Sequence, residues 1–147
     1  MIEDKTIQAV SESLPVIDVA AGIIWRDNTF LAAQRKKSGA FENLWEFPGG
    51  KCEAGESPEA ALIRELSEEL GITVLQCSLW QTIEHEYSEQ NYRVRLYFFH
   101  VRAFSGEARA QENQVLRWVT PQEALQLVFL PADQGILTRL NALRLIN

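Results

Sequence analysis

Three glutamates close together on one predicted helix are the first feature of the sequence that could do chemistry. Glu65, Glu68 and Glu69 are spaced i, i+3 and i+4, so an α-helix would place them on one face. Their mutual repulsion should destabilise an isolated helix by about 0.2–0.5 kcal/mol per pair. A divalent cation would reverse that effect, and carboxylate oxygens suit Mg²⁺ or Mn²⁺. The cluster therefore indicates either a metal site that meets phosphate or a solvated helix face on which Arg64 pairs with Glu68.

The wider spacing around the cluster decides between these interpretations. Nine positions follow one pattern: Gly50, Glu56, Arg64, Glu65, Leu66, Glu68, Glu69, Gly71 and Ile72. With ordinary residue frequencies, a chance match of this kind is on the order of one in ten million. The sequence therefore resembles the Nudix hydrolases, whose signature box has this spacing.

Residues outside the box resemble one branch of that family. Three segments are similar to the MutT branch, which includes oxidised-dGTP and CTP pyrophosphohydrolases. They are the run from Trp45 to Lys51, the Gln34-Arg35 pair and the Leu130–Asp133 segment. The resemblance implies an α+β fold, an αβα sandwich with a mixed sheet. It also implies a Mg²⁺-dependent enzyme, in which Mn²⁺ can substitute, that converts a nucleoside triphosphate to monophosphate and pyrophosphate. Another Nudix substrate, or a nucleotide-binding module without catalysis, stays as the alternative.

The resemblance also assigns the metal ligands. It makes Glu68 and Glu69 the principal metal carboxylates, with the Gly49 carbonyl completing the site. Glu65 is implied as either the general base or a further metal ligand. The clustered carboxylates would neutralise charge on the phosphates through the cation, as phosphoanhydride hydrolysis requires.

Three further charged residues complete the predicted catalytic group. Arg64 and Glu56 are expected to brace the loop against the helix. Glu112, in the polar segment 109–113, corresponds to a loop glutamate that MutT-like enzymes bring to the metal or the attacking water. A loop glutamate with no such resemblance would usually face solvent.

The predicted substrate contacts divide into a phosphate group and a base group. Arg35 and Lys51 are candidates for phosphate, Arg35 through its bidentate fork, although each could be an ordinary surface charge. Phe47, Tyr87 and Trp45 could form the wall beside the base, whereas aromatic residues in strands are more often part of the core.

Asp133 is the residue that bears most directly on the choice of base. MutT itself has Asn at the matching place and the CTP-hydrolysing relatives have Asp. An ionised Asp only accepts hydrogen bonds and favours an amino group such as N4 of cytosine, whereas a protonated Asp in an apolar pocket could still bind an oxidised purine. Asp133 could instead cap the last helix.

Local signals predict the elements that must position these groups. Ser57 can cap a helix that starts at Pro58, carries an apolar stripe of Leu62, Leu66 and Leu70, and ends at Gly71. Strands are predicted over 16–25, 30–36, 44–47, 72–86, 92–103 and 115–119, with a flexible loop over 50–56. Thr120 begins a capping box for a short helix, and an apolar stripe of Ile136, Leu137, Leu140, Leu143 and Ile146 predicts a final helix.

Composition sets the remaining bounds. The chain has 147 residues, a net charge of −6 and two cysteines. We therefore expect a flexible arm over 1–15, a single domain over 16–147, a cytoplasmic protein without a disulfide framework, and no nucleic acid polymer or membrane partner. The sequence leaves monomer and homodimer open. The Gly49-Gly50-Lys51 triplet is not a phosphate-binding P-loop, because no glycine lies five positions before Gly50 and Cys52 replaces the Ser or Thr.

Overall fold

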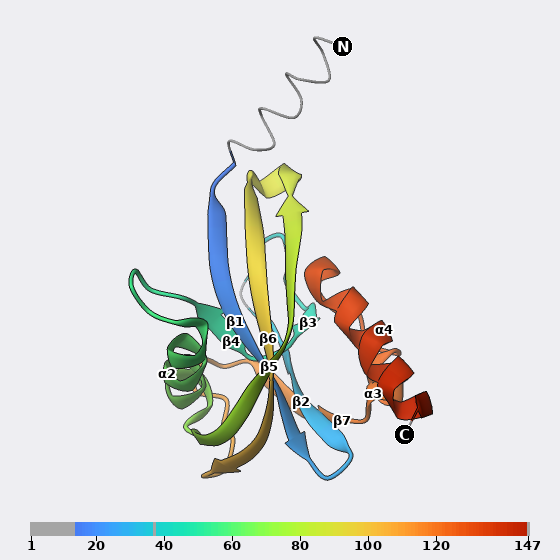
Figure 1. The fold of residues 1–147 in the computed structure, drawn as a ribbon. Coiled ribbons are helices and arrows are strands. Elements are labelled where there is room, and N and C mark those ends of the chain that lie inside the picture. Colours follow the sequence, from blue (N-terminus) through green and yellow to red (C-terminus); the bar gives the residue numbers. More distant parts are fainter. Residues whose placement is uncertain (1–13, 37, 147) are drawn as a thin grey trace.

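A mixed β-sheet lies between two helical layers. The computed structural model describes residues 14–36 and 38–146. Helix α2 (Pro58–Leu70) lies on one side of the sheet, and α3 (Pro121–Ala124) and α4 (Pro131–Ile146) lie on the other (Figure 1). The predicted αβα sandwich with a mixed sheet is confirmed.

The sheet is organised around its first strand. Its strands are β1 (Val16–Arg26), β2 (Thr29–Gln34), β3 (Trp45–Glu46), β4 (Gly49–Lys51), β5 (Thr73–Tyr87), β6 (Tyr92–Ser105) and β7 (Val115–Val119). The order is β3-β2-β1-β6-β5, with β4 paired to β1 and β7 to β2. Strands β1 and β6 are parallel, and the other pairs are antiparallel. A short 3₁₀ turn (Ser88–Gln90) connects β5 to β6.

Helix α2 forms where its capping residues predict it. The Ser57 side chain accepts a hydrogen bond from the Ala60 N–H, and Pro58 occupies the first turn. At the other end Gly71 has φ 72°, and its N–H donates to the carbonyls of Leu66 and Ser67. This left-handed conformation costs a glycine little and ends the helix in time for β5.

Two apolar cores fix the helices on the sheet. The first, the α2-side core, contains the predicted stripe of Leu62, Leu66 and Leu70, all fully buried against alternate residues of β1 and β6. The second, the α4-side core, contains Ile136, Leu137 and Leu140. Successive strand residues point to opposite faces, so a strand supplies both cores by simple alternation.

Two expectations about local structure were wrong. Residues Gly49–Lys51 form strand β4, although Gly50 was expected to start a flexible loop. A Cβ at Gly49 would lie 2.0 Å from the Ala20 carbonyl oxygen, so the glycine permits a backbone approach to β1 that a turn signal does not reveal. Leu143, in the predicted apolar stripe of α4, is 36% exposed, whereas Ile136, Leu137 and Leu140 of the same stripe are buried. The side chain of Ile146 lies outside the described part of the helix.

The chain before β1 is described only at its end. The predicted arm falls largely on residues 1–13, outside the described residues. The Leu14 and Pro15 carbonyls accept hydrogen bonds from Arg93, at 3.4 and 2.9 Å. Among the described residues, no helix is long and apolar enough to cross a membrane.

Candidate active site

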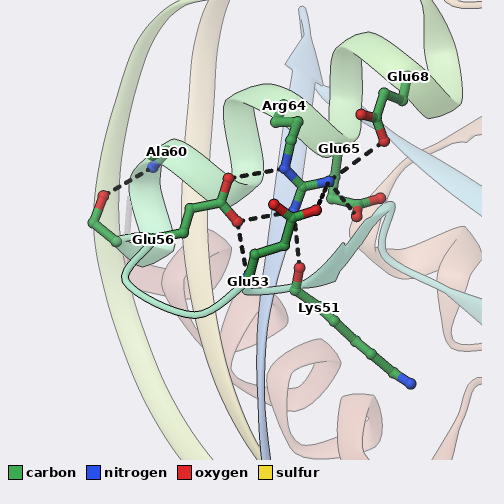
Figure 2. Close-up of polar contacts among 8 residues, drawn as sticks. Lys51, Glu53, Glu56, Ala60, Arg64, Glu65 and Glu68 are labelled. Carbon is green, nitrogen blue, oxygen red and sulfur yellow. Dashed lines mark hydrogen bonds and ion pairs between the residues drawn. The ribbon is translucent and has the colours of Figure 1, made fainter.

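Arg64 is the centre of an ion-pair network on α2. Its Nε and Nη2 donate to the two carboxylate oxygens of Glu56, at 2.8 and 2.9 Å, in a bidentate pair. Its Nη1 donates to Glu65 at 2.9 Å, and Nη2 also donates to the Lys51 carbonyl at 3.0 Å. Figure 2 shows these contacts together with the weaker pairs to Glu53 and Glu68. The expected brace between loop and helix is therefore present, and the guanidinium lowers the pKa of Glu56 to about 2.

Glu65 lies directly against the backbone of β4. A Cβ at Gly50 would be only 2.2 Å from the Glu65 carboxyl carbon, so no other residue fits at this position without moving the glutamate. The bond from Arg64 holds the carboxylate from the other side. Gly50 and Arg64 together therefore restrict Glu65 to one place, which a general base or metal ligand requires.

Glu69 is half-buried beside the same strand. Its Oε2 accepts a hydrogen bond from the Gly49 N–H at 3.3 Å. Burial, followed by the negative charges of Glu46 and Glu112, raises its pKa to about 8. The site thus gathers carboxylates whose repulsion a bound cation would relieve. The predicted ligand role of the Gly49 carbonyl stays a prediction.

Glu68 and Glu112 occupy the exposed side of this acidic cluster. Glu68 is 63% exposed and lies 3.4 Å from Arg64. Glu112 is exposed on a loop that packs onto the end of α2, where the N–H groups of Arg109 and Gln111 donate to the Leu70 and Glu69 carbonyls. These bonds satisfy helix carbonyls that have no intrahelical partner. The docked loop brings Glu112 close enough to influence the pKa of Glu69.

The acidic cluster is an open site and not a closed metal cage. Among the described residues, no group of three or more His, Cys, Asp or Glu side chains is gathered tightly enough to enclose an ion. Mg²⁺ usually keeps several waters and takes one or two carboxylates together with substrate phosphate. The donor set, carboxylate oxygens that repel one another around Glu69, fits such a cation.

A cavity of about 570 Å³ lies between the sheet and the start of α4. Its walls are mainly aliphatic and aromatic residues of β1, β5 and β6. All five residues predicted to bind substrate line it, namely Arg35, Phe47, Lys51, Tyr87 and Asp133. Gly49 and Gly50 line it too, so β4 is the wall that this pocket shares with the acidic cluster.

The predicted aromatic residues differ in what they contribute. Phe47 is buried and contacts Phe30, Phe98 and Phe129 in the α4-side core, while its accessible edge lines the pocket. Trp45 belongs to the same core and does not line the cavity. Trp45 is therefore a core residue, whereas Phe47 belongs to the core and also lines the pocket.

Glu46 is a pocket residue that sequence reasoning missed. Its Oε2 accepts a hydrogen bond from Arg35 Nε at 2.8 Å, and it lines the cavity. Burial raises its pKa, and Arg35 opposes that shift. One signal could have identified it: a charged residue, Glu46, lies between two aromatic residues, Trp45 and Phe47, which are both buried. The bond uses the Nε of Arg35, and the predicted contact of Arg35 with phosphate stays a prediction.

Asp133 is buried at the inner end of the pocket, 4% exposed. It is the third residue of α4, and its N–H donates to the Leu130 carbonyl, so it does not occupy the predicted helix-cap position. Burial, together with the charge of Glu46, raises its pKa well above the ordinary value, while the Phe47 backbone N–H opposes the shift. This direction favours the protonated carboxyl, the second of the two Asp133 alternatives that the sequence leaves open.

Comparison with known proteins agrees with this geometry. The model of the NUDIX domain family matches residues 16–140. A CTP pyrophosphohydrolase of Escherichia coli is 42% identical over 132 residues, which cover 89% of this chain and 96% of the relative. An 8-oxo-dGTP diphosphatase of the same organism is 35% identical over 128 residues, covering 86% and 98%. A solved MutT structure, from work on Aliivibrio salmonicida and Vibrio cholerae, superposes with a TM-score of 0.76 at 33% identity, covering 86% of this chain and 98% of that one.

Proposed function

Because this chain belongs to the NUDIX domain family, we propose that it hydrolyses nucleoside triphosphates to nucleoside monophosphate and pyrophosphate. The observation that carries this proposal is the position of β4. Gly49, Gly50 and Lys51 line the pocket, and the same three residues contact Glu69, Glu65 and Arg64. A nucleoside bound in the pocket would therefore extend its phosphates across β4 toward the carboxylates.

Individual residues of the chain then have separate roles in the proposed reaction. The Lys51 side chain extends away from Arg64, which bonds only its carbonyl, so the ammonium is available for a phosphate (Figure 2). Arg35 supplies a second cation at the pocket wall. Glu65, fixed between Gly50 and Arg64, is the candidate to accept the proton of the attacking water. The water oxygen bonds to one phosphorus of the α–β phosphoanhydride as its bond to the bridging oxygen breaks, and the products are the nucleoside monophosphate and pyrophosphate.

Four glutamates would hold a divalent cation, namely Glu65, Glu68, Glu69 and Glu112. We propose that this cation is Mg²⁺, for which Mn²⁺ can substitute. When bound, the cation neutralises phosphate charge and favours the departure of pyrophosphate. Arg64 acts by positioning Glu65 and the Lys51 carbonyl, not by contacting phosphorus.

The proposed base is either cytosine or oxidised guanine, as in the two relatives above. Glu46 offers hydrogen-bond acceptors, and the Asp133 carboxyl, whose raised pKa favours the protonated form, then offers one donor and one acceptor. The two groups can therefore pair with a base edge that mixes amino and carbonyl groups. Both base classes have such an edge, so a substrate panel must separate them.

The test is a panel of 8-oxo-dGTP, dGTP, CTP and dCTP, with ADP-ribose and a dinucleoside tetraphosphate as the other substrate classes. We expect monophosphate and pyrophosphate from at least one triphosphate in Mg²⁺ or Mn²⁺, and no turnover in excess EDTA. Undiminished turnover in EDTA would contradict the metal requirement. Orthophosphate as the sole first product, or cleavage of the other classes alone, would contradict the pyrophosphohydrolase assignment.

A further inference from the structure

The Tyr87 hydroxyl connects the sheet to the end of α4 that carries Asp133. Tyr87 is the last residue of β5 and is 8% exposed. Its Oη accepts a buried hydrogen bond from the Ala132 N–H at 3.2 Å. Ala132 is the second residue of α4, so this N–H has no acceptor within the helix. A strand side chain far away in sequence therefore supplies part of the cap of α4.

The first turn of α4 is held at two points. The first is made by backbone groups: the Leu130 N–H donates to the Trp45 carbonyl, and the Trp45 N–H donates to the Val128 carbonyl, each at 2.9 Å. The second is the Tyr87 hydroxyl on Ala132. Asp133 follows Ala132 directly, so the Tyr87 bond is the side-chain anchor nearest to its main chain. The Asp133 carboxyl itself accepts a hydrogen bond from the Phe47 backbone N–H.

The ring of Tyr87 is itself fixed. It packs edge-on against Phe41, with ring centroids 5.1 Å apart, and against Tyr92 at 5.4 Å. Tyr87 and Tyr92 face each other across the β5–β6 pair. These contacts place the hydroxyl oxygen at the end of β5, against the sheet.

We propose that Tyr87 is a positioning residue for nucleotide selection: through Ala132, its hydroxyl holds Asp133 where the carboxyl meets the nucleobase. This inference rests on the proposed function, since it requires the base to enter the pocket. The phosphate chemistry takes place at α2, on the far side of β4. Loss of the hydroxyl should therefore change which nucleotide binds more than how fast a bound nucleotide is cleaved.

The test compares Tyr87→Phe with Tyr97→Phe. Tyr97 lies on β6, packs against the α2-side core and accepts a hydrogen bond from Arg95, so the control loses a comparable bond away from the pocket. For the best nucleotide of the panel, Tyr87→Phe should raise KM by about 3- to 10-fold with kcat within about 2-fold. The kcat/KM ratio between the best and second-best nucleotides should fall by a similar factor. Tyr97→Phe should leave both quantities unchanged.

A double-mutant cycle with Asp133→Ala tests the route of the effect. If Tyr87 acts through Asp133, Tyr87→Phe should cause no further change in the nucleotide ratio once Asp133 is Ala. Fully additive effects would overturn the proposal, because the hydroxyl would then act on the nucleotide directly. An unchanged KM and ratio in Tyr87→Phe, or an equal loss of kcat with every nucleotide, would also overturn it. If the wild-type protein cleaves no nucleoside triphosphate, the proposed function fails, which is a distinguishable result.

Discussion

The acidic cluster on α2 and the pocket beside α4 meet at β4, but they are assembled in different ways. The centre of the cluster is local: Arg64 bonds Glu56, Glu65 and the Lys51 carbonyl, which lie on α2, on the loop before it and at the end of β4. The pocket is not local, since Arg35, Tyr87 and Asp133 come from three distant parts of the chain. Most of the acidic cluster thus comes from one short segment, with Glu112 added by a distant loop. The pocket depends on how the whole sheet brings separate segments together.

The two regions also differ in how their carboxyl groups are treated. Arg64 compensates Glu56 fully and lowers its pKa. In contrast, Asp133 has no direct cationic partner among its described contacts, and burial raises its pKa. Arg64 therefore favours the ionised form of Glu56, whereas burial favours the protonated form of Asp133. Glu69 on α2 resembles Asp133 in this respect, because burial raises its pKa too. The predictions below test this contrast.

The largest effect is expected from Glu69→Gln. The substitution keeps size and helix propensity but removes a charge from the acidic cluster, so turnover should fall by at least about 100-fold with the fold intact. Steady-state kinetics and circular dichroism measure the two properties. Near wild-type activity together with a collapsed melting temperature would make Glu69 a structural residue.

Gly50→Ala tests whether β4 positions Glu65. The new methyl group would need space now occupied by the Glu65 carboxyl, so Glu65 must move and kcat should fall by about 30- to 100-fold. Gly135→Ala is the matched control, because a Cβ at Gly135 in α4 meets nothing within 4 Å. Equal activity of both variants would show that the place of Glu65 is unimportant.

Asp133 substitutions test the neutral-carboxyl interpretation of the pocket. Asp133→Ala removes a buried polar partner, which should cost about 1–2 kcal/mol, or roughly 5- to 30-fold in kcat/KM. Asp133→Asn keeps one donor and one acceptor and should change kcat/KM and the ratio between nucleotides by less than about 5-fold. If the nucleotide preference of the Asp133→Asn variant instead shifts strongly toward oxidised guanine nucleotides, Asp133 works as an ionised acceptor.

The smallest effect concerns the stability of the metal-free protein. The pKa of Glu69 is about 8 in the folded state, above its ordinary value of 4.5. The protonated Glu69 side chain therefore makes its full contribution to the free energy of unfolding below pH 4.5, and this contribution is lost as the pH rises to about 8. Each pKa unit corresponds to about 1.4 kcal/mol, so Glu69→Gln should stabilise the metal-free protein by about 1 kcal/mol or more at pH 8 and little at pH 4.5. Denaturant unfolding in EDTA at the two pH values measures this, and equal effects at both would exclude the titration of Glu69 as the cause.

The sequence alone determined most of the phosphate-handling side. The bounds of α2 follow from Ser57, Pro58 and Gly71, whose effects act over a few residues. The box glutamates and Arg64 meet because helical spacing places them together, so family membership and reaction class could be predicted. The other strand ends agree with expectation to within two residues, since alternation is also a local signal.

Only the tertiary structure decided the strand status of Gly49–Lys51, the place of Glu46 in the pocket wall and the upward direction of the Asp133 pKa shift. The approach of Gly49 to Ala20 depends on pairing with β1, which local turn signals do not encode. Glu46 and Asp133 lie far apart in the chain, and the charge of Glu46 raises the pKa of Asp133 only because folding brings the two together. Burial and through-space electrostatics depend on every neighbouring segment at once, whereas capping and helical spacing depend on a few adjacent residues.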